Sequence, residues 1–557
     1  MFLDMLLSNT AMQPLFLIFA FLFLMVDAFF HPLQAASALP LLSNGDFETG
    51  SDKPAGWPLP DGAAWSLEEG NHFLTVTARP EKMVTVYREV PLSDDLHALR
   101  LRFRVRINEL KRGKANWHDG RIILDFKDAD GKKLSGASPQ VFTGTTKGWS
   151  ERSVEFLVPP GAVKLELMPA MFMAASGAFD LDDFELSPTD PAPIVAKKEA
   201  ADKKKAEDIA KRASRVKPQV SKATEAQLPP MLHVSGNQIL NSSGVAVWLQ
   251  GVSIPSLEWS ASGDNVLKST RVAIEDWKAN VIRLSIRDDF WRGSGPYQAD
   301  GGAGYRQLID DVVNLAGSKR AYVVLDLHRF RAPEEKHADF WRALAGKYKN
   351  HPAVLFELFN EPHDLTWEVW RDGGFVSTEK KADSTVVAEN KEKLKGFASI
   401  GIQSLIGAVR STGAKNIVIA GGLDWSYDLS GILNGFPLQD PDGNGIVYST
   451  HVYPWKSDWM GKFIKAAEQH PIFIGECGAS QERMSFIPPE QHEDPSTWVP
   501  DFLGLVQKHR YHWAAWCFHP KSSPCLLSDW DYTPTTYWGA HAKAALAGQK
   551  FVPGRLR

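Results

Sequence analysis

Short apolar runs alternate with polar residues along the first part of the chain, from about residue 41 to residue 186. Gly, Pro and Asp separate the runs, which cover residues 73–77, 99–105, 122–126, 154–158 and 163–168. A period of two is typical of strands that bury one face, and short strands separated by regular turn residues are typical of all-β folds. The pattern predicts an N-terminal jelly-roll β-sandwich over residues 39–188.

A polar segment follows at residues 189–230. It consists mainly of Ala, Lys, Asp and Glu and contains almost no large apolar residue. Because such a segment cannot bury a core, we expect a solvated, charged linker that forms helix only transiently.

Beyond residue 231, apolar runs alternate with helical patterns, in the rhythm that is typical of a parallel sheet. We count eight runs, at residues 245–252, 281–286, 321–328, 353–359, 417–422, 446–453, 471–475 and 512–518. Eight strands with helices between them predict a C-terminal (β/α)8 TIM barrel over residues 231–557. Active sites of such barrels lie at the C-terminal ends of the strands, so polar residues there are the first candidates for chemistry.

The N-terminus carries one apolar run, at residues 15–26, followed by the small residues of positions 35–38. This pattern predicts a signal peptide over residues 1–38, with cleavage before Leu39 and export to the periplasm or the medium. No Lys or Arg precedes the run, which leaves an uncleaved membrane-anchored form or a misplaced start codon as alternatives.

Composition narrows the function classes. The net charge of -4 gives no basic excess that would attract nucleic acid, and no obligatory protein partner is evident. Three cysteines are too few for a disulfide scaffold. We expect Cys477, Cys517 and Cys525 to be free buried thiols, with a Cys517–Cys525 disulfide as the alternative. No His cluster has the spacing of a metal site, so we expect catalysis without a metal or other cofactor.

Two predicted strand ends supply glutamates, Glu361 after the fourth run and Glu476 after the seventh. Hydrolysis of a glycoside needs such a pair. One carboxyl group must be protonated to assist the leaving oxygen, and the other must be ionised to attack the anomeric carbon or to activate water. The two environments must therefore give the two groups different pKa values.

From about Met231 to its C-terminus the chain resembles glycoside hydrolase family 5. The motif Asn360-Glu361-Pro362 carries the resemblance, together with further residues in the expected order: Arg283, His328, His451, Tyr453, Glu476 and Trp516. The resemblance implies that Glu361 is the acid/base, Glu476 is the nucleophile of a retaining double displacement, and Asn360 bonds the sugar 2-hydroxyl.

These matches imply an exported endo-β-1,4-glucanase, a cellulase, that binds a β-linked polysaccharide or oligosaccharide. A β-mannanase or another β-glucan hydrolase is the alternative enzyme, because the family shares its catalytic residues across substrates. A non-catalytic carbohydrate-binding barrel is the alternative of another class, and it would lack one of the carboxylates.

The supporting residues also have physical reasons to lie near the glutamates. Arg283 and Tyr453, as donors to Glu476, would favour its charged form and lower its pKa. His451 is expected to tune or orient the acid, and Trp516 offers a flat platform beneath the sugar.

Strand parity separates catalytic from structural polar residues, because residues two apart point the same way. Asp326 then faces inward with His328, and Glu357 with Glu361; we expect Asp326 and Glu357 to be buried, hydrogen-bonded barrel residues. His328 is expected to order substrate hydroxyls or neighbouring carboxylates. Two cysteines point outward by the same parity: Cys477 and Cys517.

Four tryptophans in the predicted loops are candidates for a substrate cleft, of which the last two are favoured: Trp259, Trp291, Trp425 and Trp455. Each is either a sugar platform or a packing residue, because Trp also buries well.

The N-terminal sandwich resembles the galactose-binding-like carbohydrate-binding modules, through the sequence around Asp46 and Glu48 at its start and around Asp183 at its end. Modules of this kind often hold a structural calcium, and these three carboxylates supply the hard oxygen ligands that calcium takes. Trp117 and Trp149 are either sugar platforms or core residues. The alternative is a purely structural accessory domain.

Overall fold

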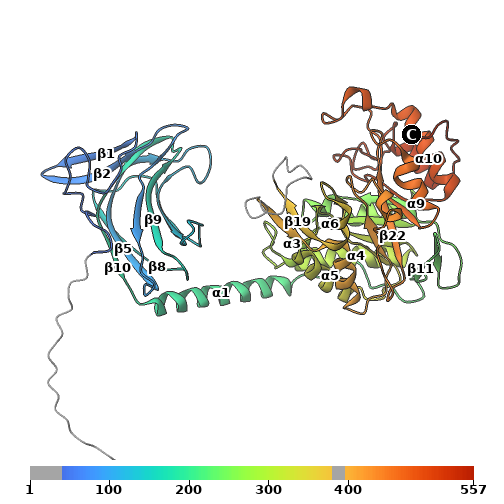
Figure 1. The fold of residues 1–557 in the computed structure, drawn as a ribbon, viewed down its shortest axis with the longest axis horizontal. Coiled ribbons are helices and arrows are strands. Elements are labelled where there is room, and N and C mark those ends of the chain that lie inside the picture. Colours follow the sequence, from blue (N-terminus) through green and yellow to red (C-terminus); the bar gives the residue numbers. More distant parts are fainter. Residues whose placement is uncertain (1–39, 379–394) are drawn as a thin grey trace, which may run out of the picture. The chain divides into compact units, whose positions relative to one another are not determined.

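The computed structural model describes residues 40–378 and 395–557, and the chain divides into two compact units, Met1–Asp202 and Lys203–Arg557 (Figure 1). The predicted signal peptide lies outside the described residues. Within the described ranges, no helix combines the length and the apolar character that a membrane crossing requires.

The first unit contains two five-stranded antiparallel sheets around one apolar core. One sheet has the order β1 (Ala63–Glu68), β2 (Asn71–Thr77), β10 (Ser176–Pro188), β5 (Ala98–Lys111), β8 (Ser150–Leu157). The other has the order β3 (Met83–Thr85), β9 (Lys164–Phe172), β6 (Gly120–Lys127), β7 (Ala137–Phe142), with β4 (Arg88–Pro91) also paired to β9. Every run predicted from the sequence overlaps one of these strands, so an all-β unit is confirmed.

Strand β5 shows why the alternating pattern gives this fold. Leu99, Leu101 and Phe103 are at most 1% exposed in the core, whereas Arg100 and Arg102 lie on the outer face. There Arg100 pairs with Glu155 at 2.7 Å and Arg102 with Glu151 at 2.7 Å, both on the neighbouring strand β8. Such exposed cross-strand pairs contribute little stability, so the buried apolar face determines the register.

The predicted linker is more ordered than expected. Helix α1 (Pro191–Ala213) buries none of its residues, which agrees with a solvated spacer. After it, the backbone N–H of Gln219 donates to the Asp311 carboxylate at 3.0 Å, and that of Ala223 donates to the Asn314 side chain at 3.2 Å. Both acceptors belong to helix α4 (Ala303–Ser318), so residues 219–223 are fixed on the second unit.

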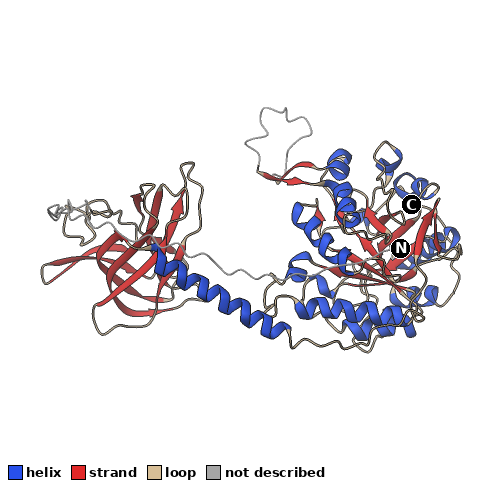
Figure 2. Ribbon diagram, turned by 90° about the horizontal axis from the view of Figure 1, so that it is seen from below, coloured by secondary structure: helices blue, strands red, loops and turns tan. Residues whose placement is uncertain are grey.

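The second unit is a closed parallel barrel, as predicted. Its strand order is β13 (Gln250–Ile254), β14 (Val281–Ile286), β15 (Tyr322–Leu327), β17 (Val354–Glu357), β21 (Val418–Gly421), β22 (Ile446–Val452), β23 (Ile472–Cys477), β24 (His512–Ala515). The helices are, besides α4, α2 (Val266–Glu275), α3 (Asp288–Arg292), α5 (Glu335–Lys347), α6 (Trp367–Asp372), α7 (Gly401–Arg410), α8 (Ser430–Leu433), α9 (Lys465–Ala467), α10 (Pro495–His509) and α11 (Gly539–Leu546). Figure 2 shows them around the strands.

The first barrel strand begins later than the sequence predicts. Val245 is 59% exposed, and its carbonyl accepts from Asn241 at 2.9 Å, while Val247 donates to Ile239 at 2.9 Å. These bonds extend the hairpin of β11 (Leu232–Ser235) and β12 (Gln238–Asn241), which precedes the barrel. The apolar run at residues 245–252 therefore combines the end of a hairpin with the start of β13.

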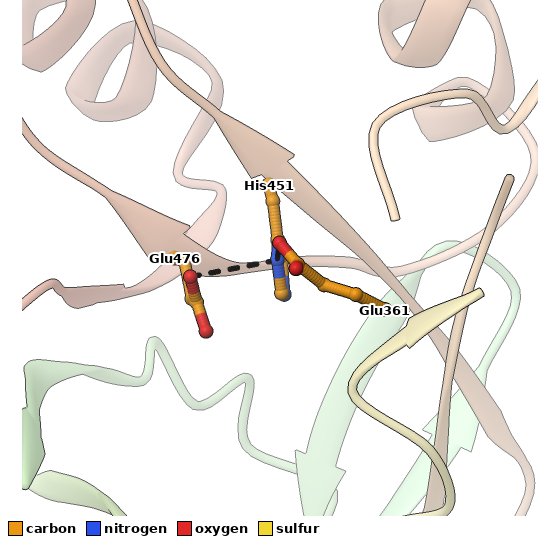
Figure 3. A group of neighbouring side chains, drawn as sticks. All are labelled: Glu361, His451 and Glu476. Carbon is orange, nitrogen blue, oxygen red and sulfur yellow. Dashed lines mark hydrogen bonds and ion pairs between the residues drawn. The ribbon is translucent and has the colours of Figure 1, made fainter. Parts of the chain in front are cut away.

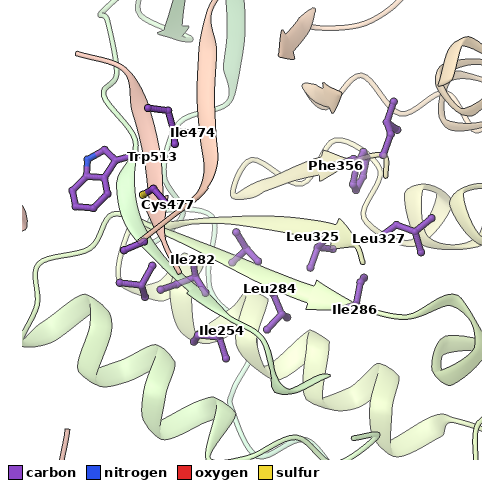
Figure 4. Close-up of a cluster of buried hydrophobic side chains, with 14 of the residues drawn as sticks. Ile254, Ile282, Leu284, Ile286, Leu325, Leu327, Phe356, Ile474, Cys477 and Trp513 are labelled. Carbon is purple, nitrogen blue, oxygen red and sulfur yellow. The ribbon is translucent and has the colours of Figure 1, made fainter. Parts of the chain in front are cut away.

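Side chains on the two faces of the barrel strands have different surroundings. Outward ones pack against the helices, and Ile282, Leu325 and Cys477 are among those drawn in Figure 4. Inward ones form a smaller apolar cluster that includes Val281, Val324 and Phe473. Further along the same strands the inward residues become polar, which places charge near the C-terminal ends of the strands.

All three cysteines are free thiols, and Cys477 and Cys517 are buried. The preferred prediction of free buried thiols agrees with this structure for Cys477 and Cys517, whereas Cys525 is only half-buried. Cys517 and Cys525 both donate to the carbonyl of Ser522, over 2.9 Å and 3.3 Å.

Candidate active site

Glu361, His451 and Glu476 meet at the C-terminal end of the barrel (Figure 3). A carboxylate oxygen from each glutamate and a ring nitrogen of the histidine all lie within 4.8 Å of one another. His451 Nδ1 is 2.9 Å from Glu361 Oε1 and 3.6 Å from Glu476 Oε2. Two carboxyl groups this close match the short spacing of retaining glycosidases, about 5 to 5.5 Å, rather than the wider gap of inverting ones.

A β-bulge aims Glu476 into the site. The register between β22 and β23 shifts by one residue, so that Thr450 pairs with Ile474 but His451 pairs with Glu476. The extra residue is Gly475, where a Cβ would lie 2.5 Å from Ser449 Oγ and 3.1 Å from Glu357 Oε1. Only glycine fits there, and the bulge turns the next side chain inward.

Arg283 on β14 connects the polar residues of the barrel interior. Its side chain is fully buried and donates to Glu357 at 2.6 Å, to Glu476 at 3.0 Å and to Asn360 at 2.6 Å. It also lies 3.1 Å from Asp326. The predicted structural roles of Asp326 and Glu357 are confirmed, because both are 0% exposed and paired with this guanidinium.

Asn360 lies between β17 and the short strand β18 (Glu361–Pro362). Its side-chain oxygen accepts from Arg283, which fixes the orientation of the amide. The amide nitrogen is buried and has no hydrogen-bond partner within the protein. A free buried donor beside two carboxylates is a suitable group for a hydroxyl of a bound substrate.

Tyr453 and Arg283 both donate to Glu476, as the sequence predicts. The Tyr453 hydroxyl is 2.7 Å from Oε2, and Arg283 bonds the other oxygen. Burial nevertheless raises the pKa of Glu476 above its ordinary value, and the two donors only oppose that rise. The predicted lowering effect of the two donors is confirmed, but the sequence does not show the depth of burial, which outweighs it.

Glu361 differs from Glu476 in its partners. Burial and the neighbouring charge of Glu476 raise the pKa of Glu361 well above its ordinary value. Glu361 has no bonded cation comparable to Arg283, so Glu476 ionises first and Glu361 keeps its proton to higher pH. Burial also lowers the pKa of His451 well below its ordinary value, so the ring is neutral beside Glu361.

These shifts predict a bell-shaped dependence of kcat/KM on pH. The rate falls as the pH drops through the pKa of Glu476, which gains a proton, and falls as the pH rises through that of Glu361, which loses one. In Glu361→Gln, hydrolysis of dinitrophenyl β-cellobioside, whose leaving group needs no proton, should lose the alkaline fall and keep the acid one. An alkaline fall that persists in this variant would assign that limb to another group.

The structure adds a residue that the sequence analysis missed. Glu258 ends the short helix η1 (Ser256–Glu258) after β13, and its Oε2 lies 3.1 Å from His328 Nε2. Burial raises the pKa of Glu258. His328 in turn contacts Asp326 at 2.6 Å and stacks on Trp516, with ring centroids 5.6 Å apart. The loop position of Glu258 gave no sequence signal, because no strand pattern marks it.

The four candidate tryptophans divide by exposure. Trp259 and Trp425 are 43% and 42% exposed, and Trp455 is half-buried against Tyr453, 4.8 Å between ring centroids. Trp291 is only 5% exposed and packs edge-on against Phe340 of α5. For Trp291 the packing alternative is confirmed and the cleft role is excluded, because the side chain lies on the buried face of α3.

In the first unit, the ends of the sandwich lie together, since Phe184 N donates to Gly45 O at 2.8 Å. The three predicted calcium ligands do not converge, however. Glu48 bonds His72, and Asp183 pairs with Arg104 at 2.6 Å. In the described part of the chain, only Glu361, His451 and Glu476 bring three potential ligand atoms within 4.8 Å. The sequence indicates that the two ends of the sandwich meet, but not that Glu48 and Asp183 pair with other residues there.

The two sandwich tryptophans also differ. Trp117 is 50% exposed. Arg104 and Arg106 lie over the ring of Trp149, 5.3 Å and 4.9 Å from its centroid, so this ring is not a free platform.

Residues 240–522 match the family model described as cellulase, glycosyl hydrolase family 5. The chain belongs to this family. It is a glycoside hydrolase that acts on O-glycosyl bonds, and cellulases of family 5 need no cofactor for catalysis. The match spans all the site residues described above, from Glu258 to Trp516.

Relatives of this family-5 chain include the cellulase CelDZ1 of a Thermoanaerobacterium species, which is 24% identical over 57% of this chain and 76% of its own length. The endoglucanase MaCel5A of Microbulbifer sp. (strain ALW1) is 22% identical over 51% of this chain, and the match spans half of that relative. Among solved structures, the β-glucanase SdGluc5_26A of Saccharophagus degradans is 25% identical, with a TM-score of 0.45 over 59% of this chain and 97% of that chain.

Proposed function

We propose that the protein is an exported endo-β-1,4-glucanase that cleaves β-linked glucan with retention, with Glu361 as acid/base and Glu476 as nucleophile. One observation carries the proposal. The two glutamates approach within 4.8 Å, and only Glu476 is bonded by Arg283 and Tyr453. The arrangement supports one protonated and one ionised carboxyl group at neutral pH.

In the first step, the Glu476 carboxylate attacks the anomeric carbon while Glu361 gives its proton to the glycosidic oxygen. The bond to that oxygen breaks, the shortened chain leaves as an alcohol, and a covalent glycosyl ester forms on Glu476. The Arg283 and Tyr453 donors hold the attacking carboxylate in place, which lowers the entropic cost of the step.

In the second step, the ionised Glu361 takes a proton from water, which attacks the same carbon and releases Glu476. The sugar therefore keeps its β configuration after two inversions. His451 beside Glu361 orients the carboxyl group through both steps, and Asn360 offers its free amide nitrogen to a sugar hydroxyl near the reacting carbon.

The names of the relatives, cellulase and endoglucanase, support a β-1,4-glucan as substrate. β-Mannan remains the alternative. We expect release of reducing sugars from carboxymethyl cellulose or mixed-linkage β-glucan to exceed release from mannan and xylan by at least tenfold. A preference for mannan would replace the glucanase assignment while leaving the catalytic pair unchanged.

For the sandwich we propose a jelly-roll carbohydrate-binding module that keeps the barrel near polysaccharide. The exposed Trp117 supports a sugar contact, because flat aromatic faces suit sugar rings. Export through the N-terminal segment at residues 1–38 is also part of the proposal and rests on the sequence pattern.

A further inference from the structure

A cavity of about 670 Å³ lies beside Trp259 and takes no part in the mechanism above. Its volume is within the range of small-molecule sites. The loops after β13 and β14 form one wall, and residues before the barrel form another. Four of the lining residues carry the argument: Arg212, Gln219, Trp259 and Tyr297.

The cavity continues a row of side chains that starts at the catalytic centre. Trp516 stacks on His328, and His328 contacts Glu258, the neighbour of Trp259. The Trp259 ring also packs edge-on against His519, which follows β24, at 5.3 Å. These contacts lead from the catalytic centre to the wall of the cavity at Trp259.

The position of the cavity in the barrel determines which end of the chain it would face. Trp259 follows β13, whereas Glu361 follows β17, three places further around the eight strands. The acid lies on the side of the leaving group, because it protonates the glycosidic oxygen. The loops after β13 and β14 line the cavity, so it lies two to three strands away from Glu361, which favours the side of the non-reducing end.

The lining suits sugar residues. Trp259 is 43% exposed and Tyr297 fully exposed, so both present aromatic surface to solvent. Among the residues that the structure describes, the side chains of Arg212, Gln219 and Tyr297 have no hydrogen-bond or ion-pair partner, which leaves their donors available for hydroxyl groups.

The residues before the barrel are held at the cavity. The backbone of Gln219 is bonded to Asp311, as described above. Ile209, in the last turns of α1, lies so close to the loop after β14 that a Cβ at Gly301 would come within 2.8 Å of it. Both residues belong to the same compact unit as the barrel.

We propose that this cavity binds the distal, non-reducing sugar residues of a β-glucan chain, and that Arg212 and Gln219 extend the substrate site beyond the barrel. The inference rests on the proposed glucanase function. It assigns a binding role to a segment whose composition alone indicates only a spacer.

Two variants of the full chain test the proposal: Tyr297→Ala, and Arg212→Ala combined with Gln219→Ala. The matched control is Lys211→Ala combined with Lys217→Ala, exposed residues of the same segment that do not line the cavity. For both test variants kcat/KM on cellohexaose should fall roughly five- to tenfold, the effect of a lost aromatic contact or a few hydrogen bonds. On cellotriose, which on this proposal fills only the sites next to the catalytic pair, the change should stay within twofold.

The cleavage position gives a second measurement. The substrate is cellohexaose labelled at its reducing end. The unmodified protein should cut it nearer that end, because more sugar residues then occupy the non-reducing side of the site. The variants should shift cleavage toward the middle of the chain. Equal losses on both oligosaccharides, no loss, or an unshifted cleavage position would overturn the proposal. If the unmodified protein cuts neither oligosaccharide, the proposed glucanase function itself fails. This result is distinct from failure of the cavity proposal, in which the unmodified protein is active but the variants do not differ as expected.

Discussion

Replacing Glu476 with Ala is expected to lower kcat on β-glucan by about 10⁴- to 10⁶-fold, the loss that follows removal of a nucleophile in enzymes with covalent intermediates. Glu361→Ala should lose roughly 10²- to 10⁴-fold, the usual contribution of general acid–base catalysis. Reducing-sugar assays measure both effects, and circular dichroism checks that each variant folds. Near-normal turnover in either variant would remove that residue from the mechanism.

Added azide distinguishes the two roles. With dinitrophenyl β-cellobioside as substrate, azide can take the place of the missing carboxylate in Glu476→Ala and should give the α-glycosyl azide, by one inversion. In Glu361→Ala it should attack the glycosyl ester on Glu476 and give the β-glycosyl azide. The opposite pairing of products would exchange the two assignments.

Arg283→Met is expected to have the largest effect on stability. The guanidinium is fully buried among Asp326, Glu357 and Glu476, and its loss leaves buried carboxylates without their cation. Breaking a buried ion pair in this way costs about 3 to 5 kcal/mol. We therefore expect the barrel transition in scanning calorimetry to move to clearly lower temperature, and turnover to fall as Glu476 loses its donor.

The control is Arg342→Met on helix α5, whose side chain is 47% exposed and pairs with Glu335 and Asp339. The unfolding temperature of this variant should stay nearly unchanged, because exposed ion pairs contribute little to stability. Glu357→Gln added to Arg283→Met should recover part of the lost stability, since it removes one unpaired charge. Equal stability of Arg283→Met and the native protein would contradict the role assigned to this cation.

Much of the barrel is predictable from the sequence because its strands are apolar runs between helical patterns. All eight predicted runs overlap barrel strands, and the polar residues at their ends converge as expected of this fold. The failure at residues 245–252 has a local cause. An apolar run does not distinguish the end of the β11–β12 hairpin from the start of β13.

The remaining differences concern side chains whose surroundings depend on the tertiary structure. Gly475 within a strand run is only a weak sign of the bulge that aims Glu476, and no pattern marks the loop that brings Glu258 to His328. Trp291 shows that a tryptophan after a strand can face a neighbouring helix. The net effect on the Glu476 pKa depended on burial, which a list of donors does not give.

The central claim is a double displacement by Glu476 and Glu361, and the configuration of the first product tests it most directly. Proton NMR of a fresh digest of cellohexaose, recorded before mutarotation, reports that configuration. The short distance between the two carboxyl groups predicts that the β-anomer appears first and the α-anomer grows in later. An α-anomer formed first would contradict retention and the nucleophilic role of Glu476.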